Sequence, residues 1–181
     1  DVVVMVVDAS EGLSEQDVRI AGFIHEEGKP SIVVMNKWDL IEKDAYSMNK
    51  FNDVLSEDLK FMSYFVPVYT SALTGQRLNK IMENVERVYA NANYRISTSM
   101  LNEILSNAVS VNEPPSKNGK RCKIYYMTQA SVHPPTFVIF LNNKDLMHFS
   151  YVRYLENSIR SAVDFSGTPI KLILKSKSDK E

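Results

Sequence analysis

The feature that most constrains the fold is a short apolar run that ends abruptly in polar residues, the stretch SIVVMNKWDL at residues 31–40. Residues 32–35 are apolar and mostly β-branched, follow Gly28 and Pro30, and form a run too short for a helix. This pattern predicts a strand that is buried on both faces, as in a parallel sheet.

A second apolar run, VVVMVV at residues 2–7, precedes this strand, and a helical pattern separates the two. We expect Ser14 to cap that helix, with Asp17 three residues further on in a capping-box arrangement. Strand, helix and strand in this order predict a βαβ unit with a right-handed crossover. Because the sequence opens directly into a buried strand, we expect this chain to be part of a longer protein.

Three polar residues, Asn36, Lys37 and Asp39, follow the strand expected at residues 32–35. In open α/β sheets ligands bind beyond the carboxyl ends of the strands, which is where these side chains are expected. An aspartate there can accept two hydrogen bonds from a planar N–H/NH₂ edge, which guanine has and adenine lacks. Since an unpaired buried carboxylate is costly, Asp39 predicts discrimination in favour of guanine.

The periodicity of the chain predicts two domains, 1–94 and 95–181, divided at a polar stretch that loses the helical pattern. The first ends in a strand at 65–69 and an amphipathic helix at 78–92, and resembles the later half of a doubly wound α/β domain. The second shows an α-β-β-α-β order, typical of a small α+β module. Its expected elements are a helix at 101–109, strands at 123–130 and 136–141, a helix capped by Ser150 and stopped by Gly167, and a strand at 170–174.

Charge is distributed unevenly between the two domains. Residues 1–94 contain 15 acidic and 9 basic residues, and residues 95–181 contain 7 acidic and 12 basic residues, which gives net charges of −6 and +5. A basic second domain is consistent with a polyanionic partner such as RNA, although an unevenly charged solvated surface explains it equally well. The sequence has one cysteine, Cys122, no expected metal site, no leader and no membrane-spanning run, which together favour the cytoplasm.

Four motifs occur together along the chain: VVVMVVDASEG, NKWDL, TSALTGQ, and a basic α-β-β-α-β module after them. The Ser71-Ala72-Leu73 triplet follows the next strand, 35 residues after Asn36. This combination resembles the EngA (Der) family of bacterial GTPases, which have two tandem GTPase domains and a KH-like domain. The resemblance implies an incomplete P-loop GTPase domain followed by a KH-like domain, with GTP or GDP as ligand.

The resemblance also assigns roles to the motif residues. Asp39 would bind the guanine N1 and N2 groups, Asn36 the N7 side, and the Lys37 stem would lie along the ring. The backbone N–H of Ala72 would donate to O6, with Ser71 and Leu73 shaping the turn. As partners it implies the large ribosomal subunit and its rRNA, and other domains of the parent chain. Trp38 occupies the free position of the motif, and we expect its ring to pack against the adjoining helix.

A phosphate-binding loop of the form Gly-x-x-x-x-Gly-Lys-Ser/Thr does not occur in these 181 residues. Mg²⁺ is therefore expected only in the intact parent, and this chain alone is expected to be inactive as a GTPase. The Asp-x-x-Gly match at 164–167 follows the base motif, and we interpret it as chance. The alternative hypothesis is a non-catalytic module that binds rRNA or docks to another domain and retains a vestigial base motif.

The later domain lacks the Gly-x-x-Gly loop with which ordinary KH domains clamp nucleic acid. RNA contact or docking would instead use basic residues. The candidates are Lys117, Lys120, Arg121, Lys123, Arg153, Arg160, Lys171 and Lys175.

Overall fold

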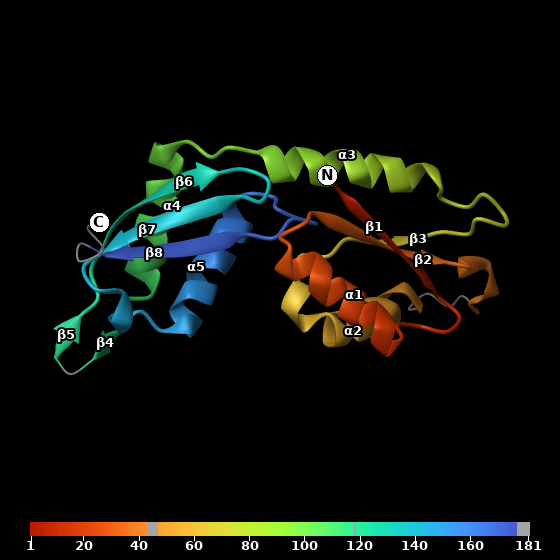
Figure 1. The fold of residues 1–181 in the computed structure, drawn as a ribbon, viewed down its shortest axis with the longest axis horizontal. Helices are drawn as coiled ribbons and strands as arrows, with labels where there is room; N and C mark the ends of the chain where they lie inside the picture. The colour runs from red at the N-terminus through yellow and green to blue at the C-terminus, as the bar shows by residue number, and fades with distance from the viewer. Residues whose placement is uncertain (43–46, 118, 177–181) are drawn as a thin grey trace. The chain divides into compact units, whose positions relative to one another are not determined.

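The computed structural model describes residues 1–42, 47–117 and 119–176, and in it the chain forms two compact units (Figure 1). Unit 1 contains Asp1–Ala92 and Phe165–Pro169. Unit 2 contains Asn93–Asp164 and the described residues from Ile170 onward. Unit 1 therefore includes a short segment from late in the sequence, between residues that belong to unit 2.

Unit 1 is built on a parallel sheet with the strand order β1-β2-β3, and β2 pairs with β1 from Ser31 opposite Val3 to Asn36 opposite Asp8. The βαβ unit predicted from the sequence is thus confirmed. The elements are β1 (Val3–Asp8), α1 (Glu15–Glu26), β2 (Ser31–Asn36), the 3₁₀ helix η1 (Trp38–Leu40), α2 (Ser47–Asp58), the 3₁₀ helix η2 (Lys60–Met62), β3 (Pro67–Tyr69) and α3 (Asn79–Asn93).

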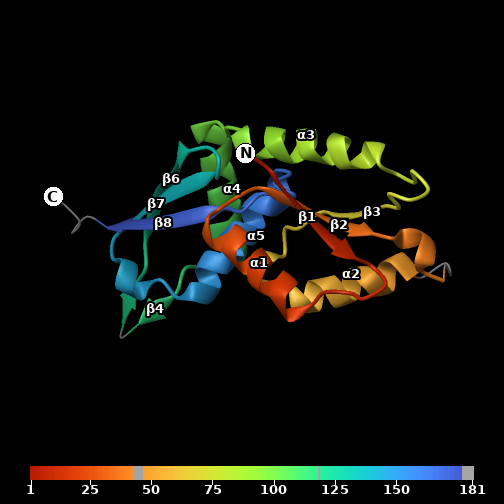
Figure 2. The same ribbon diagram turned by 45° about the vertical axis from the view of Figure 1, so that its right-hand side comes forward.

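Alternate residues of β2 are buried in two separate cores. Val33 and Met35 pack in one core with residues of α1 and α2, whereas Ile32 and Val34 pack in the other with Val88 of α3. The ribbon views show α1 and α2 on one side of the sheet and α3 on the other (Figures 1 and 2). This arrangement of helices on both faces is that of a doubly wound α/β domain.

The start of α1 follows the sequence prediction. The Ser14 side chain accepts a hydrogen bond from the backbone N–H of Asp17, and the Asp17 carboxylate accepts one from the backbone N–H of Ser14. This reciprocal capping box satisfies two donors that the first turn of a helix leaves unpaired.

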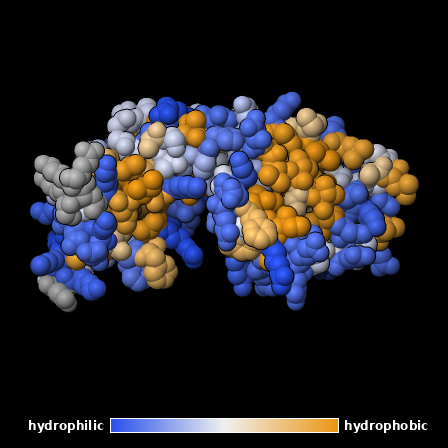
Figure 3. Space-filling model, viewed as in Figure 1, coloured by the Kyte–Doolittle hydropathy of each residue, from blue (hydrophilic) through white to orange (hydrophobic). Residues whose placement is uncertain are grey.

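The sheet face on the side of α3 is only partly covered. Val4 and Val6 of β1 are 39% and 60% exposed, and Met82 of α3 is 61% exposed. Hydrophobic residues gather on this face over β1 and α3 (Figure 3). An exposed apolar face beside an edge strand is typical of a surface that packs against further protein.

The late segment of unit 1 pairs with the start of β2. The backbone N–H of Gly167 donates to the carbonyl of Tyr64 at 2.6 Å, and the N–H of Ser31 donates to the carbonyl of Gly167 at 2.7 Å. Gly167 has a φ of +72°, and a Cβ added there would lie 2.3 Å from Cγ2 of Val88. The prediction that Gly167 stops the preceding helix is wrong, because α5 (Phe149–Ala162) ends before it.

Unit 2 contains a three-stranded sheet with the order β6-β7-β8, in which β7 pairs antiparallel with β6 and parallel with β8. The predicted α-β-β-α-β order is confirmed, and a short hairpin, β4–β5, lies where a loop was expected. The further elements are α4 (Thr98–Val111), β4 (Ser116–Lys117), β5 (Lys120–Arg121), β6 (Ile124–Ser131), β7 (Thr136–Leu141), the 3₁₀ helix η3 (Lys144–Leu146), α5 and β8 (Lys171–Ser176).

The cap of α5 differs from the sequence prediction. The N-cap residue is His148 rather than Ser150, and its side chain accepts a hydrogen bond from the backbone N–H of Ser150. A histidine is a less usual cap than serine, which is why the sequence favoured the hydroxyl two residues later.

Two amide side chains hold β6 within unit 2. Asn102 of α4 accepts a hydrogen bond from the N–H of Met127 at 2.9 Å and donates to the carbonyl of the same residue at 3.0 Å. Gln129 accepts from the N–H of Ile96 at 2.7 Å and donates to the carbonyl of Tyr94 at 3.0 Å. Each side chain thereby pairs backbone groups that burial would otherwise leave unsatisfied.

Across the part of the chain that the structure describes, every helix is too short or too polar to cross a bilayer.

Candidate functional site

A cavity of about 430 Å³ lies where β2 ends. It is lined by Asn36, Lys37, Asp39, Leu40, Ala72 and Leu73. Five of the six residues that the sequence indicated for guanine binding therefore lie around one hollow. They meet there because β2 and β3 are parallel neighbours, so the loops that follow them leave the sheet at the same edge.

The sixth residue, Ser71, is fully buried and shapes the loop after β3. Its side chain accepts a hydrogen bond from the N–H of Thr74 at 3.1 Å, and its own N–H donates to the carbonyl of Gln76 at 3.2 Å. These bonds close a compact turn, which fixes where Ala72 and Leu73 lie.

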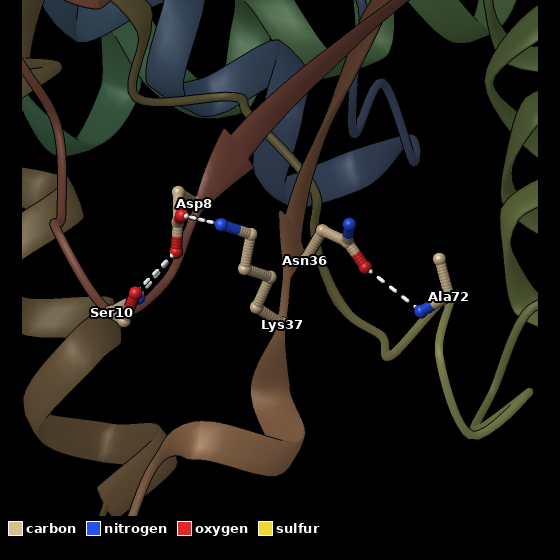
Figure 4. Close-up of polar contacts among 5 residues, drawn as sticks. All are labelled: Asp8, Ser10, Asn36, Lys37 and Ala72. Atoms are coloured by element: carbon tan, nitrogen blue, oxygen red, sulfur yellow. Dashed lines mark hydrogen bonds and ion pairs between the residues drawn. The ribbon is translucent and has the colours of Figure 1, made fainter.

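Asn36 links the two loops directly. Its side-chain oxygen accepts a hydrogen bond from the backbone N–H of Ala72 at 3.0 Å (Figure 4). The resemblance assigned this N–H to the O6 atom of a guanine base. In the structure it is used by Asn36, so a base bound there would have to share or replace that contact.

Asp39 has a carboxylate oxygen that a bound ligand could satisfy. Its Oδ1 atom is buried and has no hydrogen-bond partner among the described residues, although the residue lines the cavity. An unsatisfied buried carboxylate oxygen is costly, and a donor on a bound molecule would remove that cost. A guanine base has such donors at N1 and N2, so the residues present fit this ligand.

Trp38 anchors the segment that carries Asp39. It is 2% exposed, and its ring lies edge-on to Phe51 of α2 at 5.0 Å and tilted against Tyr69 of β3 at 4.4 Å. The expectation that this ring packs against the adjoining helix is confirmed. Aromatic packing of this kind holds η1 firmly against the sheet.

Lys37 forms an ion pair with the residue that ends the neighbouring strand. Its Nζ lies 2.6 Å from Oδ2 of Asp8, while Oδ1 of Asp8 accepts hydrogen bonds from the N–H and the hydroxyl of Ser10 at 2.9 and 2.6 Å (Figure 4). The Lys37 ammonium and the two Ser10 donors lower the pKa of Asp8 to about 2, and Asp8 raises the pKa of Lys37. Both groups are therefore charged at neutral pH.

The sequence did not indicate Leu40 or Asp8 as parts of this site. Leu40 is 60% exposed and lines the cavity together with Leu73, which is 87% exposed. Two exposed leucines beside polar groups suit a planar ligand with an apolar face. Asp8 was detectable in principle, because it ends the strand next to β2, but nothing in the sequence indicated its ion pair with Lys37.

The eight candidate basic residues of unit 2 come from several elements. Lys117, Lys120 and Arg121 come together on the β4–β5 hairpin, with Lys117 paired opposite Lys120. The others lie on different elements: Lys123 precedes β6, Arg153 and Arg160 are on α5, and Lys171 and Lys175 are on β8.

Two of these cations have acidic partners. Arg121 Nη2 lies 2.6 Å from Glu113, and Arg160 Nε lies 2.9 Å from Glu156. Arg160 is the less exposed of the two. Their charges are therefore partly neutralised within unit 2.

Comparison with known proteins assigns both parts of the chain. Residues 1–91 match the family described as the elongation factor Tu GTP binding domain, and residues 95–175 match the KH-domain-like C-terminal part of EngA bacterial GTPase enzymes. The matches therefore define the class of the chain as part of a GTP-binding domain followed by a KH-like domain. More specifically, the chain belongs to the EngA family, whose members are also named GTPase Der.

Relatives support the same assignment along the whole chain. GTPase Der of Alkaliphilus oremlandii is 52% identical over 181 residues, and GTPase Der of Acetivibrio thermocellus is 52% identical over 177 residues. These alignments cover 100% and 98% of this chain but 41% and 40% of the relatives, so the chain spans well under half their length.

One solved structure is similar at a low level. It is a crystal structure of Era in complex with MgGDPNP and nucleotides 1506–1542 of 16S ribosomal RNA. The alignment covers 96% of this chain and 64% of that chain, with a TM-score of 0.42 and 20% sequence identity. A likeness of this size supports no inference about function.

Proposed function

We propose that this chain supplies the base-recognition part of a guanine-nucleotide-binding GTPase of the EngA kind. Residues 1–94 would be the later part of a GTPase domain and residues 95–181 its KH-like domain. The observation that carries the proposal is the buried, unpaired Oδ1 of Asp39 at a cavity of about 430 Å³. A guanine base presents adjacent N1–H and N2 amino donors to this carboxylate, whereas adenine has no ring N–H beside its amino group.

The remaining lining residues complete the proposed site. Lys37 and Asn36 would lie beside the base, Leu40 and Leu73 would contact its flat faces, and Ser71 would hold the loop that carries Ala72. GTP hydrolysis in the full protein would need residues that bind the phosphates and Mg²⁺. Among the described residues no group of three or more His, Cys, Asp or Glu side chains could hold a metal ion.

The exposed apolar face over β1 and α3 supports the proposal that further protein packs here. Val4 and Val6 lie on an edge strand of a sheet that has three strands among the described residues. The phosphate-binding half of the GTPase domain would cover this face and pair with β1.

As partners of the KH-like domain we propose the large ribosomal subunit and its rRNA, in the cytoplasm. Support comes from the family and from the exposed cations of the β4–β5 hairpin, where Lys117 and Lys120 lie opposite each other. Binding through such cations should weaken steeply as salt concentration rises. Docking of unit 2 against other domains of the full protein is the second candidate.

The base-recognition proposal is tested by changing Asp39 in the full-length protein. Asp39→Asn replaces an acceptor by a donor on one side, so binding of GDP should fall at least about a hundredfold while binding of xanthosine diphosphate, which has a carbonyl at C2, rises. Affinities are measured by titration of a fluorescent nucleotide analogue and competition with unlabelled nucleotides.

Asp53→Asn provides the matched control, since Asp53 is exposed on α2 and outside the cavity lining. It should leave both affinities unchanged. If Asp39→Asn bound GDP as tightly as the unmodified protein, base recognition by this carboxylate would be excluded.

A further inference from the structure

We infer that Asp8 is a positioning residue for the proposed guanine site. Its contact with Lys37 holds the Lys37 side chain where the base would bind. The inference rests on the proposed function and adds to it a residue outside the base motif. It is carried by the geometry at the ends of β1 and β2, where the two side chains meet at 2.6 Å.

The backbone directs Lys37 toward this contact. Lys37 has φ 59° and ψ 34°, a left-handed conformation that few residues other than glycine adopt. It is the point at which the chain leaves β2 and turns into η1. The side chain then extends across the edge of the sheet, so that its ammonium reaches the end of β1 (Figure 4).

Asp8 is itself held in place by its neighbours. In the sheet register it lies opposite Asn36, and the next residue, Ala9, donates its N–H to the carbonyl of Asn36 at 2.8 Å. One carboxylate oxygen accepts two hydrogen bonds from Ser10, which leaves the other directed at Lys37. The acceptor is therefore fixed before any ligand arrives.

This arrangement matters because an unrestrained lysine has many rotamers, and binding a ligand against its stem would order them at a cost in entropy. The Lys37 side chain is 55% exposed, so packing alone does not restrain it. The contact with Asp8 orders the stem in advance along the wall of the cavity. Asp39, in contrast, reads the edge of the base, so Asp8 should influence affinity and not the choice of base.

The test is a double-mutant cycle in the full-length protein, with a fluorescent GDP analogue as the probe. Asp8→Asn keeps the size of the side chain and removes its charge, and Lys37→Met keeps the unbranched stem and removes the ammonium. We expect Asp8→Asn to weaken GDP binding about fivefold to tenfold in the presence of Lys37, and to have no further effect in the Lys37→Met background. The preference for GDP over xanthosine diphosphate should not change.

Two additional variants separate positioning from charge and from folding. Glu11→Gln removes a negative charge that also acts on Lys37 through space, and it should leave GDP affinity unchanged. Asp8→Glu retains the charge but displaces it by one methylene, so it should give an intermediate affinity. Thermal melting verifies that each variant is folded, and Asp8→Glu replaces Asp8→Asn in the cycle if the latter does not fold.

Each outcome decides the matter. An effect of Asp8→Asn that disappears in the Lys37→Met background supports the inference. Equal losses in both backgrounds would mean that Asp8 only stabilises the turn at Ser10, and unchanged affinity would mean that Lys37 needs no partner; either result overturns the inference and leaves the proposed function intact. If the unmodified protein binds no guanine nucleotide, both fail.

Discussion

The two units pair the backbone groups around their strands in different ways. In unit 1 the N–H of Ser31, at the start of β2, donates to the carbonyl of Gly167, which is a hydrogen bond between two backbone groups. In unit 2 the N–H and carbonyl of Met127 bond to the side chain of Asn102. The contact in unit 1 requires that residue 167 is a glycine, whereas the contact in unit 2 requires the side chain of Asn102. The units should therefore respond to opposite kinds of substitution.

The largest effect is expected from adding a methyl group in unit 1. In Gly167→Ala the new Cβ would meet Val88 at 2.3 and 2.9 Å and the carbonyl of Ser31 at 3.0 Å, at a φ of +72°. Backbone strain and overpacking together should lower the free energy of unfolding by about 3 kcal/mol, measured by urea denaturation.

Gly12→Ala is the matched control for this change. Gly12 has nearly the same φ, +76°, but no atom lies within 4 Å of the added Cβ. It should cost only the conformational strain, about 1 kcal/mol. Equal losses for the two variants would mean that the late segment does not pack against β2 as the structure has it.

A smaller loss is expected from removing a side chain in unit 2. Asn102→Ala leaves the N–H and carbonyl of Met127 without their partner, which should cost about 2 kcal/mol of unfolding free energy. Asn107→Ala on the same helix is the control, because Asn107 is exposed and should change stability little. If Asn107→Ala lowered the free energy of unfolding as much as Asn102→Ala, the change in stability would come from helix propensity and not from the hydrogen bonds to β6.

The smallest effect concerns the exposed ion pair of unit 1 and shows as a pH dependence. Because contacts with Lys37 and Ser10 lower the pKa of Asp8 from 3.8 to about 2, its stabilising contribution is present above pH 3.8 and is lost as the pH falls through about 2. Unfolding curves of the unmodified protein and of Asp8→Asn should differ at pH 5 and converge at the acid end. A difference that persisted at the acid end would contradict the ion pair as its source.

The sequence was sufficient where structure depends on local pattern. Apolar runs located β1 and β2, and Asn36, Lys37 and Asp39 were expected beyond the carboxyl end of β2, where ligands bind in open α/β sheets. Ala72 was added to this group by the family resemblance, and in the structure it lines one cavity with Asn36 and Asp39.

The sequence did not predict contacts between residues that lie far apart along the chain. Gly167 looked like a helix stop, because glycine is common at such positions and its pairing with Ser31 leaves no local trace. The sequence likewise gave no indication that Asn102 bonds to the backbone of Met127, which lies 25 residues further along the chain. To predict the ion pair between Asp8 and Lys37, one must likewise know that β1 and β2 are neighbours as well as where each strand ends.

The position of Gly167 in the sequence has a consequence for the order of folding during synthesis. Ribosomes make proteins from the N-terminus, and domains generally fold as units once their residues have emerged. Ser31 and Tyr64 emerge well before the glycine that pairs with both. Unit 1 therefore reaches its final hydrogen bonding only after residues 93–164, which form most of unit 2, have been translated.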